Sequence, residues 1–190
     1  MGYPFVGSIL DHGRLNTIKA AIKEADANGV PGALAEFGIL RGGTARMMSA
    51  ASPQRRLFVF DTFAGLPCPD PQHDARLEQG QFAATLSEAA PLLTDLPVTI
   101  VTGAFPESAI GIDPLLAVVH LDMDLYAPTA AALAWCAPRM ASDGVIVLDD
   151  LTNRETPGIR RAIEESGHAF EIVGMQAVIR VRQTLGRTQT

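Results

Sequence analysis

Cysteine, histidine and aromatic residues are scarce in this sequence, and their scarcity excludes several kinds of site. The 190 residues include two cysteines, four histidines and 6% aromatic residues. Cys68 and Cys136 fit neither the paired spacing of a zinc site nor the framework of a disulfide-rich secreted domain. We therefore expect two reduced thiols in a cytoplasmic protein, and oxygen ligands rather than sulfur or imidazole for any metal.

The sequence also lacks an excess of positive charge and a long apolar run. Its formal net charge of -6 argues against binding to a nucleic-acid backbone. No apolar run reaches the length that crosses a membrane, and the first residues show no signal-peptide pattern. Because 47% of the residues are hydrophobic, we expect one globular domain over residues 1–190, without membrane contact and with a small-molecule partner.

Short apolar runs alternate with amphipathic segments along most of the chain. Strands are expected over Ala33–Phe37, Leu57–Phe60, Val98–Val101, Leu116–Leu121 and Val145–Leu148. Helices are expected over Leu15–Ala27, Thr44–Ala51, Ser87–Leu93 with Ser87 as its N-cap, Thr129–Met140 and Pro157–Ser166. This alternation predicts an α/β fold with a doubly wound, mostly parallel sheet.

The end of the chain departs from this alternation. Residues 170–173 and 177–181 form two apolar runs around Gly174, which predicts a closing antiparallel hairpin. By analogy at the level of the fold, such a hairpin is typical of the Rossmann-like domain of class I methyltransferases more than of dehydrogenases. We also expect a helical segment within residues 1–30 and a polar tail over residues 183–190.

Two of the predicted strands end abruptly in carboxylates. These are Asp122 and Asp124 after the strand Leu116–Leu121, and Asp149 and Asp150 after the strand Val145–Leu148. The carboxyl ends of parallel strands are where open α/β sheets bind ligands, and hard oxygen ligands suit Mg²⁺ or Ca²⁺. Asp124 lies just before the expected helix at Thr129, so it can equally cap that helix.

The first strand runs into a glycine-rich turn between Glu36 and Thr44. Its glycines let the backbone approach a ligand closely. The spacing differs from the G-x-G-x-x-G of dinucleotide-binding folds, and Glu36 suits the ammonium group of S-adenosylmethionine (SAM) better than a pyrophosphate. An ordinary tight turn is the alternative. Asp61, after the second strand, is expected to accept hydrogen bonds from a ribose, although an isolated aspartate can also cap a turn.

The histidines contribute one candidate for acid–base chemistry. His120 lies inside an apolar strand and is expected to be a satisfied core residue. His73 lies in a proline-rich, polar stretch between Ala64 and Gly80, and a loop of this length is usually functional or mobile. We therefore keep His73 as a second choice of base. The sequence has neither a G-x-S-x-G nucleophile elbow nor a P-loop motif.

These segments together resemble the macrocin O-methyltransferase (TylF-like) family of SAM- and magnesium-dependent sugar O-methyltransferases. The matching stretches, which span most of the chain from Gly7 to Ser166, are residues 29–43, 58–67, 121–126 and 144–150. Two positions depart from the family pattern, because Ala33 stands where the family has an acid and Leu40 where it has an aromatic residue.

The resemblance implies a role for each group of candidate residues. It implies that SAM is bound by Glu36, Gly38, Arg41, Gly42, Gly43, Thr44, Asp61, Thr62, Gly103 and Phe105. It implies that Asp122, Asp149 and Asp150 bind Mg²⁺ and that Asp122 is also the general base. The implied reaction is Mg-assisted transfer of a methyl group from SAM to a hydroxyl of a sugar or glycosylated natural product, with the loop 64–80 closing over the site.

Three alternatives stay open at this point. A catechol-type O-methyltransferase has the same fold, but the lysine that this type carries shortly after its first metal ligand is missing, since Leu125 stands there. A nicotinamide-dependent oxidoreductase is disfavoured by the glycine spacing. The third alternative is a non-catalytic binding module with a SAM-type fold. The sequence identifies neither the acceptor nor the oligomeric state, and it is compatible with a homo-oligomer.

Overall fold

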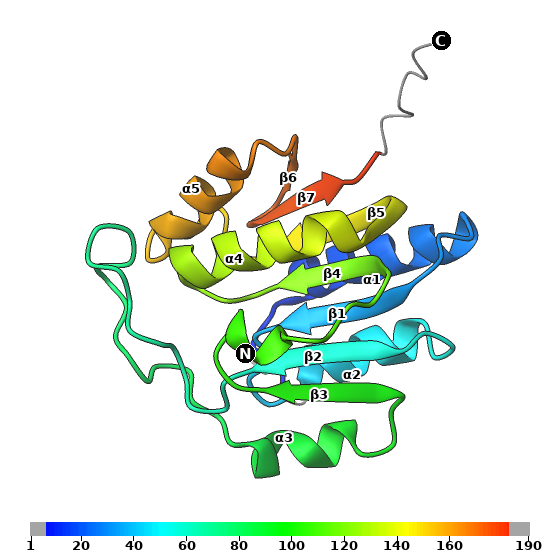
Figure 1. Ribbon diagram of the computed structural model, residues 1–190, viewed down its shortest axis with the longest axis horizontal. Coiled ribbons are helices and arrows are strands. Elements are labelled where there is room, and N and C mark those ends of the chain that lie inside the picture. The colour runs from blue at the N-terminus through cyan, green and yellow to red at the C-terminus, as the bar shows by residue number, and fades with distance from the viewer. Residues whose placement is uncertain (1–6, 183–190) are drawn as a thin grey trace.

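A computed structural model describes residues 7–182, which form a seven-stranded sheet covered by helices on both faces (Figure 1). The strands are β1 Ala33–Phe37, β2 Leu57–Asp61, β3 Val98–Thr102, β4 Leu116–Leu121, β5 Met140–Leu148, β6 Glu171–Val173 and β7 Gln176–Arg180. The helices are α1 His12–Ala27, α2 Gly43–Ala51, α3 Leu86–Leu93, α4 Tyr126–Cys136 and α5 Pro157–Ser166, with short 3₁₀ helices η1 Glu107–Ala109 and η2 Ala137–Arg139. The α/β class is confirmed.

The order of the strands explains where a ligand can bind. It is β3-β2-β1-β4-β5-β7-β6, with β1 to β5 parallel. The order reverses between β1 and β4, which creates a crevice at their carboxyl ends. The predicted closing hairpin is confirmed, because β7 pairs antiparallel with both β5 and β6.

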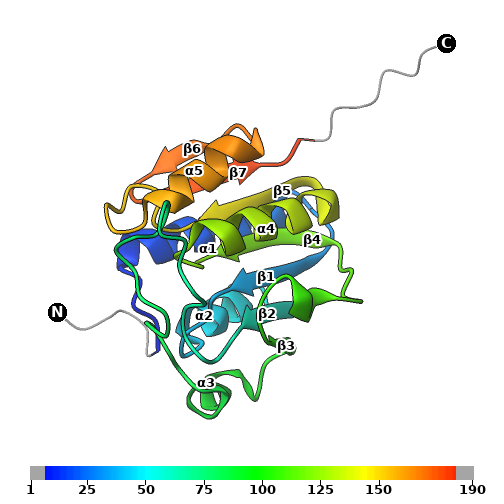
Figure 2. The ribbon, with the colours of Figure 1, turned by 60° about the vertical axis from the view of Figure 1, so that its left-hand side comes forward.

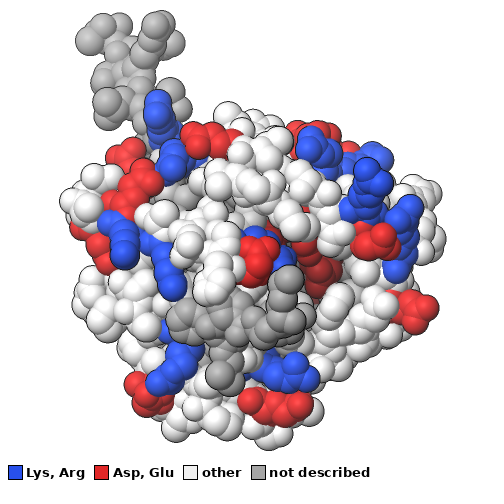
Figure 3. Space-filling view, turned by 180° about the vertical axis from the view of Figure 1, so that it is seen from behind, with Lys and Arg blue, Asp and Glu red and all other residues white. Residues whose placement is uncertain are grey.

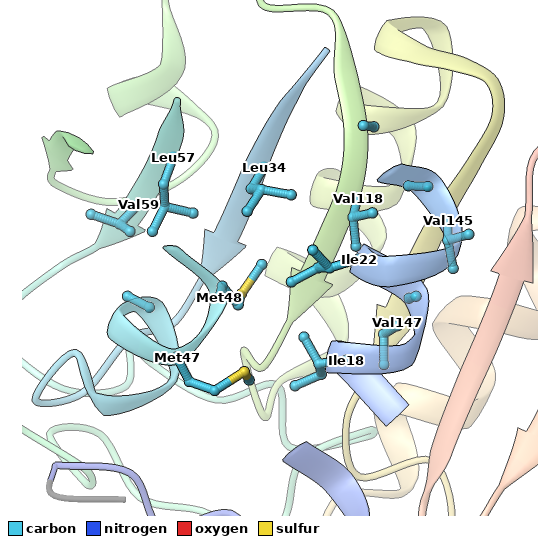
Figure 4. Packing of buried hydrophobic residues seen from close by; sticks show 14 of the residues in the cluster. Ile18, Ile22, Leu34, Met47, Met48, Leu57, Val59, Val118, Val145 and Val147 are labelled. Atoms are coloured by element: carbon cyan, nitrogen blue, oxygen red, sulfur yellow. The ribbon is translucent and has the colours of Figure 1, made fainter. Parts of the chain in front are cut away.

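Two hydrophobic clusters sandwich the sheet. On one face, α1 and α2 pack on the sheet through Ile18, Ile22, Met47 and Met48, which contact alternate strand residues such as Val118 (Figure 4). On the other face, α4 and α5 pack on the remaining strand residues (Figure 2). The fully buried strand β4 explains why the sequence showed continuous apolar runs there.

Several helix boundaries differ from the sequence prediction, and α1 begins at His12, three residues before its predicted start. The N-cap of α3 is Thr85 rather than Ser87, because Thr85 and Glu88 form a reciprocal capping box. Helix α4 covers Tyr126–Cys136 instead of Thr129–Met140. Pro138 lies within η2, and Met140 already begins β5, so the last residues of the predicted helix form a tight turn and a strand.

The segment between β2 and α3, residues 62–85, contains no helix or strand, and we call it the crossing segment. It leaves the end of β2, extends to the starts of α4 and α5, and returns to α3 (Figures 1 and 2). None of the helices within residues 7–182 combines the length and apolar character needed to span a membrane. The expected tail over residues 183–190 lies outside the described residues.

Candidate active site

A cavity of about 750 Å³ opens at the carboxyl ends of the central strands. It is lined by the turns that follow β1 to β5, by the crossing segment and by residues that precede or begin α1. Acidic side chains lie within a hollow near the middle of the face shown in Figure 3. The cavity has the volume of a typical small-molecule site and lies at the position that the reversal of strand order predicts.

The cavity has two halves, one formed after β1, β2 and β3 and the other after β4 and β5. Gly38 lies where these two halves meet. Its φ is 78°, and a Cβ at this position would collide with the backbone carbonyl of Asp122. On either side of this contact, the Gly38 amide donates to the Phe60 carbonyl and the Asp122 amide donates to the Phe37 carbonyl. Only glycine meets both the left-handed conformation and the close approach.

Glu36 and His120 form a buried pair beneath the turn. Glu36 Oε1 lies 3.0 Å from His120 Nδ1, and both side chains are essentially inaccessible to solvent. Burial raises the pKa of the Glu36 carboxyl, and the contact with His120 opposes this rise. His120 is a core residue as predicted, but its Nε2 and Glu36 Oε2 have no hydrogen-bond partner within residues 7–182. Of the two residues, only Glu36 lines the cavity, so its Oε2 is the atom available to a ligand or water.

Asp61 stabilises the glycine-rich turn from the neighbouring strand. Its Oδ2 accepts hydrogen bonds from the amides of Ile39 (2.7 Å) and Leu40 (3.2 Å), and its Oδ1 accepts one from Phe63 (2.8 Å). An ionised carboxylate offers about four lone-pair sites. Asp61 lines the cavity and keeps one of these sites free, so it combines the turn-capping role with capacity for one more donor.

Most of the predicted SAM-binding residues line the cavity, but three do not. The residues that line it are Glu36, Gly38, Thr44, Asp61, Thr62, Gly103 and Phe105. Arg41 is exposed outside it, and Gly42 and Gly43 begin α2, with Gly42 as the N-cap at a φ of 80°. The glycine pair therefore turns the chain into the helix, and the cavity wall is formed by residues on either side of it.

The predicted metal ligands are divided between two overlapping groups. Oxygen atoms of Asp122, Asp124 and Asp150 lie within 4.8 Å of one another and these residues line the cavity. Asp149 instead belongs to a second group, with His120 and Asp122, and is not among the residues that line the cavity. The structure thus adds Asp124 to the acid cluster, which we define as Asp122, Asp124, Asp149 and Asp150.

The interpretation of Asp124 as a helix cap is wrong. The N-cap of α4 is Leu125, which makes no side-chain capping bond, and Asp124 has a φ of 59°. Asp150 has a similar φ of 58°. Aspartate tolerates this left-handed conformation better than most residues, and such backbone conformations are concentrated at functional sites. The two sharp turns bring the carboxylates together.

The acid cluster carries more negative charge than its surroundings neutralise. Burial, together with repulsion from Asp149 and Asp124, raises the pKa of Asp122 well above its usual range. Burial and the charge of Asp150 raise the pKa of Asp124 to about 7. Burial also raises the pKa of Asp149, whose Oδ1 has no hydrogen-bond partner in the described part of the chain. A divalent cation would fit this set of oxygen donors and relieve the repulsion.

Arg14 partly balances the charge of these acids, a role that the sequence analysis did not predict. Its Nη1 lies 2.9 Å from Asp149 Oδ2 and 3.7 Å from Asp150 Oδ1. The side chain comes from the first turn of α1 and is 19% exposed. In the sequence Arg14 stands just before the helix predicted over Leu15–Ala27, and no local pattern distinguishes it from the other charged residues of this region.

His73, the second choice of base, does not line the cavity. Its ring packs against Tyr126, with the ring centroids 4.3 Å apart. The neighbouring residue, Asp74, is fully buried and binds the first amide of α4. The crossing segment therefore places the carboxylate of Asp74, rather than the imidazole of His73, in the interior.

The order of the strands, the antiparallel β6–β7 hairpin and the cavity at the switch point define a class I methyltransferase fold. The chain belongs to the macrocin-O-methyltransferase (TylF) family, which matches residues 2–180. It is similar in fold to the O-methyltransferase NovP, with a TM-score of 0.81 and 23% identity over 93% of this chain and 83% of that one.

Two relatives with named activities are more similar in sequence. One is the 8-demethyl-8-(2,3-dimethoxy-alpha-L-rhamnosyl)-tetracenomycin-C 4'-O-methyltransferase of Streptomyces olivaceus, 31% identical over 72% of this chain. The other is the mycinamicin III 3''-O-methyltransferase of Micromonospora griseorubida, 29% identical over 86% of this chain. This chain spans 59% of the first relative and 71% of the second.

Proposed function

We propose that this protein is a SAM-dependent O-methyltransferase that methylates a hydroxyl of a sugar or of a glycosylated natural product. The observation that carries the proposal is the meeting of a glycine-rich turn and an acid cluster in one cavity, in a chain of this family. Both named relatives are O-methyltransferases by name, and the name of the first includes a rhamnosyl group, which supports a small-molecule acceptor that carries a sugar.

The half of the cavity that follows β1, β2 and β3 suits SAM. Gly38 leaves room for a close backbone approach, Asp61 keeps a lone pair available for a ribose hydroxyl, and Glu36 Oε2 is an unpaired acceptor. Phe105 adds an aromatic surface, since its ring packs edge-on against Phe37. A bound SAM would supply an electrophilic methyl group next to the acids.

The acid cluster suits Mg²⁺. Asp122, Asp124 and Asp150 line the cavity, and Asp149 supplies an unpaired oxygen behind them. When bound there, the ion would lower the pKa of an acceptor hydroxyl and orient it. We keep Asp149 as a metal ligand in the proposal, because its Oδ1 has no partner within the described residues.

Asp122 is the proposed proton acceptor. It lies at the end of β4, at the switch point and beside the glycine-rich turn. Burial and repulsion raise the pKa of its carboxyl, which makes it a stronger base than an ordinary aspartate. His73 is less suitable, because its ring packs on Tyr126 rather than facing the cavity. The cytoplasmic location and the homo-oligomer stay predictions.

The test combines calorimetry with a methyl-transfer assay. We expect S-adenosylhomocysteine (SAH) to bind and NAD not to bind, and methyl transfer from SAM to glycosides with free vicinal hydroxyls to require Mg²⁺. Asp122→Asn should lower turnover at least about 100-fold while SAH affinity stays within about twofold. Asp143→Asn, an exposed acid in β5, is the matched control.

The alternatives predict different results. Transfer to catechols but to no glycoside would indicate the catechol-type enzyme, and SAH binding without any transfer would indicate a binding module. NAD binding without SAH binding would contradict the proposal. Full activity in excess EDTA would contradict the metal role alone.

A further inference from the structure

Asp74 is a buried carboxylate that the proposed chemistry does not use. It lies in the crossing segment, yet it has no exposed surface. Its backbone amide donates to the Asp70 carbonyl at 2.7 Å, and its carbonyl accepts from the Leu77 amide at 2.9 Å. Burial raises the pKa of the Asp74 carboxyl. A carboxylate buried at this cost in an irregular segment requires strong hydrogen-bond donors.

One donor is the Asp70 amide, 3.4 Å from Asp74 Oδ2 within the same segment, and the other is at the start of α4. The Tyr126 amide donates to Asp74 Oδ1 at 3.0 Å and to Oδ2 at 3.2 Å. Helix α4 has no cap from its own sequence, because Leu125 occupies the N-cap position. Asp74 therefore caps α4 from 52 positions away, and its negative charge is favourable at the positive end of the helix.

Asp74 also touches the start of α5. A Cβ on Gly158, in the first turn of α5, would lie 2.5 Å from Asp74 Oδ1 and 2.7 Å from Tyr126 Cβ. Gly158 has a helical backbone with no positive φ, so the glycine is required by space rather than by conformation. The carboxylate occupies the place where a side chain of α5 would otherwise lie.

The same segment forms one wall of the cavity. Arg76 and Leu77, two and three positions after Asp74, line it together with Glu155, and Arg76 pairs with Glu155 at 2.9 Å. The backbone that Asp74 holds, the start of α4, directly follows Asp122 and Asp124. One carboxylate thus contacts the end of the turn that carries two acids, and residues two and three positions after it line the same cavity.

We propose that Asp74 is a positioning residue that holds the crossing segment to the start of α4, so that the acid-bearing turn and the acceptor side of the cavity are assembled together. This inference rests on the proposed function, which gives the assembled cavity its role. Loss of Asp74 releases the part of the segment around it and loosens the turn at the same time, whereas the turn after β1 keeps its hydrogen bonds to Asp61.

Three variants and one control test this coupling. Asp74→Ala removes both acceptor oxygens, whereas Asp74→Asn keeps one and caps a helix about as well as aspartate. Gly158→Ala would stabilise an ordinary helix, but here its Cβ displaces the Asp74 carboxylate. Glu78→Ala, at an exposed residue of the crossing segment that does not line the cavity, is the matched control.

Four measurements are made on the full chain. Trypsin cleavage after Arg76, which is 59% exposed, reports release of the segment, and hydrogen exchange over residues 122–130 reports the acid-bearing turn. We expect Asp74→Ala to accelerate cleavage about tenfold or more, with faster exchange over residues 122–130. Mn²⁺ affinity should fall about tenfold, SAH affinity should stay within about twofold, Asp74→Asn should lie between, and Glu78→Ala should match the wild type.

Two results would overturn the proposal. One is unchanged cleavage after Arg76 in folded Asp74→Ala and Gly158→Ala. The other is faster cleavage with unchanged exchange over residues 122–130 and unchanged Mn²⁺ affinity, because Asp74 would then only fasten a loop. If Asp74→Ala does not fold, Asp74→Asn and Gly158→Ala make the same comparison. A wild-type protein that binds no SAH would contradict the proposed function, and one that binds no Mn²⁺ the metal role, while the cleavage and exchange results still decide the coupling.

Discussion

The two halves of the cavity are stabilised in opposite ways. The half after β1 and β2 is held by hydrogen bonds from backbone amides, three of which are accepted by the Asp61 carboxylate. The half after β4 and β5 gathers four carboxylates beside one guanidinium, and burial and repulsion raise the pKa of Asp122, Asp124 and Asp149. The turn in the first half is held by the chain's own hydrogen bonds, whereas the second half has an excess of negative charge that a divalent cation would neutralise.

The largest effect is expected where the two halves meet. Gly38→Ala places a Cβ against the Asp122 carbonyl in a left-handed conformation, and should lower the free energy of unfolding by about 3–5 kcal/mol. Urea denaturation measures it. Gly29→Ala is the control, because Gly29 also has a positive φ but nothing lies within 4 Å of its added Cβ. Equal losses in the two variants would mean that conformation alone requires the glycine.

An intermediate effect on stability is expected from Arg14, whose guanidinium lies beside the acid cluster. Arg14→Ala leaves Asp149 buried without its partner, and should lower the free energy of unfolding by about 2–3 kcal/mol. Removal of the cation raises the pKa of Asp149 further, so the folded state binds its proton more tightly than the unfolded state does. The loss should therefore grow from pH 5 to pH 8.

The control for this prediction is an exposed ion pair. Arg46→Ala removes the pair with Asp95, whose side chains are 39% and 65% exposed, and should cost less than about 1 kcal/mol at every pH. A loss in Arg14→Ala that is equally small, or that shrinks as pH rises, would contradict a role of Arg14 in balancing the acid cluster.

The smallest effect is the dependence of stability on pH in the metal-free protein. The pKa of Asp124 is about 7 in the folded state and near its usual value of about 3.9 when unfolded. The folded state therefore binds more protons between these values, and stability should fall as pH rises through them, by about 1–2 kcal/mol after allowance for solvent screening. Urea titrations in chelator measure it. Asp124→Asn and added Mg²⁺ should each flatten the slope, and a slope unchanged by both would contradict the coupling.

The sequence predicted the fold well because buried strands and helices leave local patterns of apolar and turn residues. Strand β4 appears as an unbroken apolar run, Pro157 begins α5 as expected, and Gly174 marks the closing hairpin. The acids at the ends of β4 and β5 were found for the same reason, since each directly follows a buried strand. The boundaries of α4 were missed because a short 3₁₀ turn and the start of β5 continue its apolar composition.

The arrangement inside the site could not be predicted in the same way. Arg14 and Asp149 are 135 positions apart, and Asp74 and Tyr126 are 52 apart, so neither pair leaves a local pattern. The role of Asp124 depends on a left-handed turn that its sequence neighbours do not specify. These contacts follow from the packing of whole elements rather than from the residues beside them.

Gly158 carries a consequence for how this family diverges. Its missing side chain and the Asp74 carboxylate occupy the same space, so the two positions are not free to change independently. Among related sequences, any residue larger than glycine at this place in α5 should be accompanied by loss or displacement of the acid in the crossing segment. The pair would then be inherited as a unit, and its presence in a relative would mark the same attachment of the segment to the two helices.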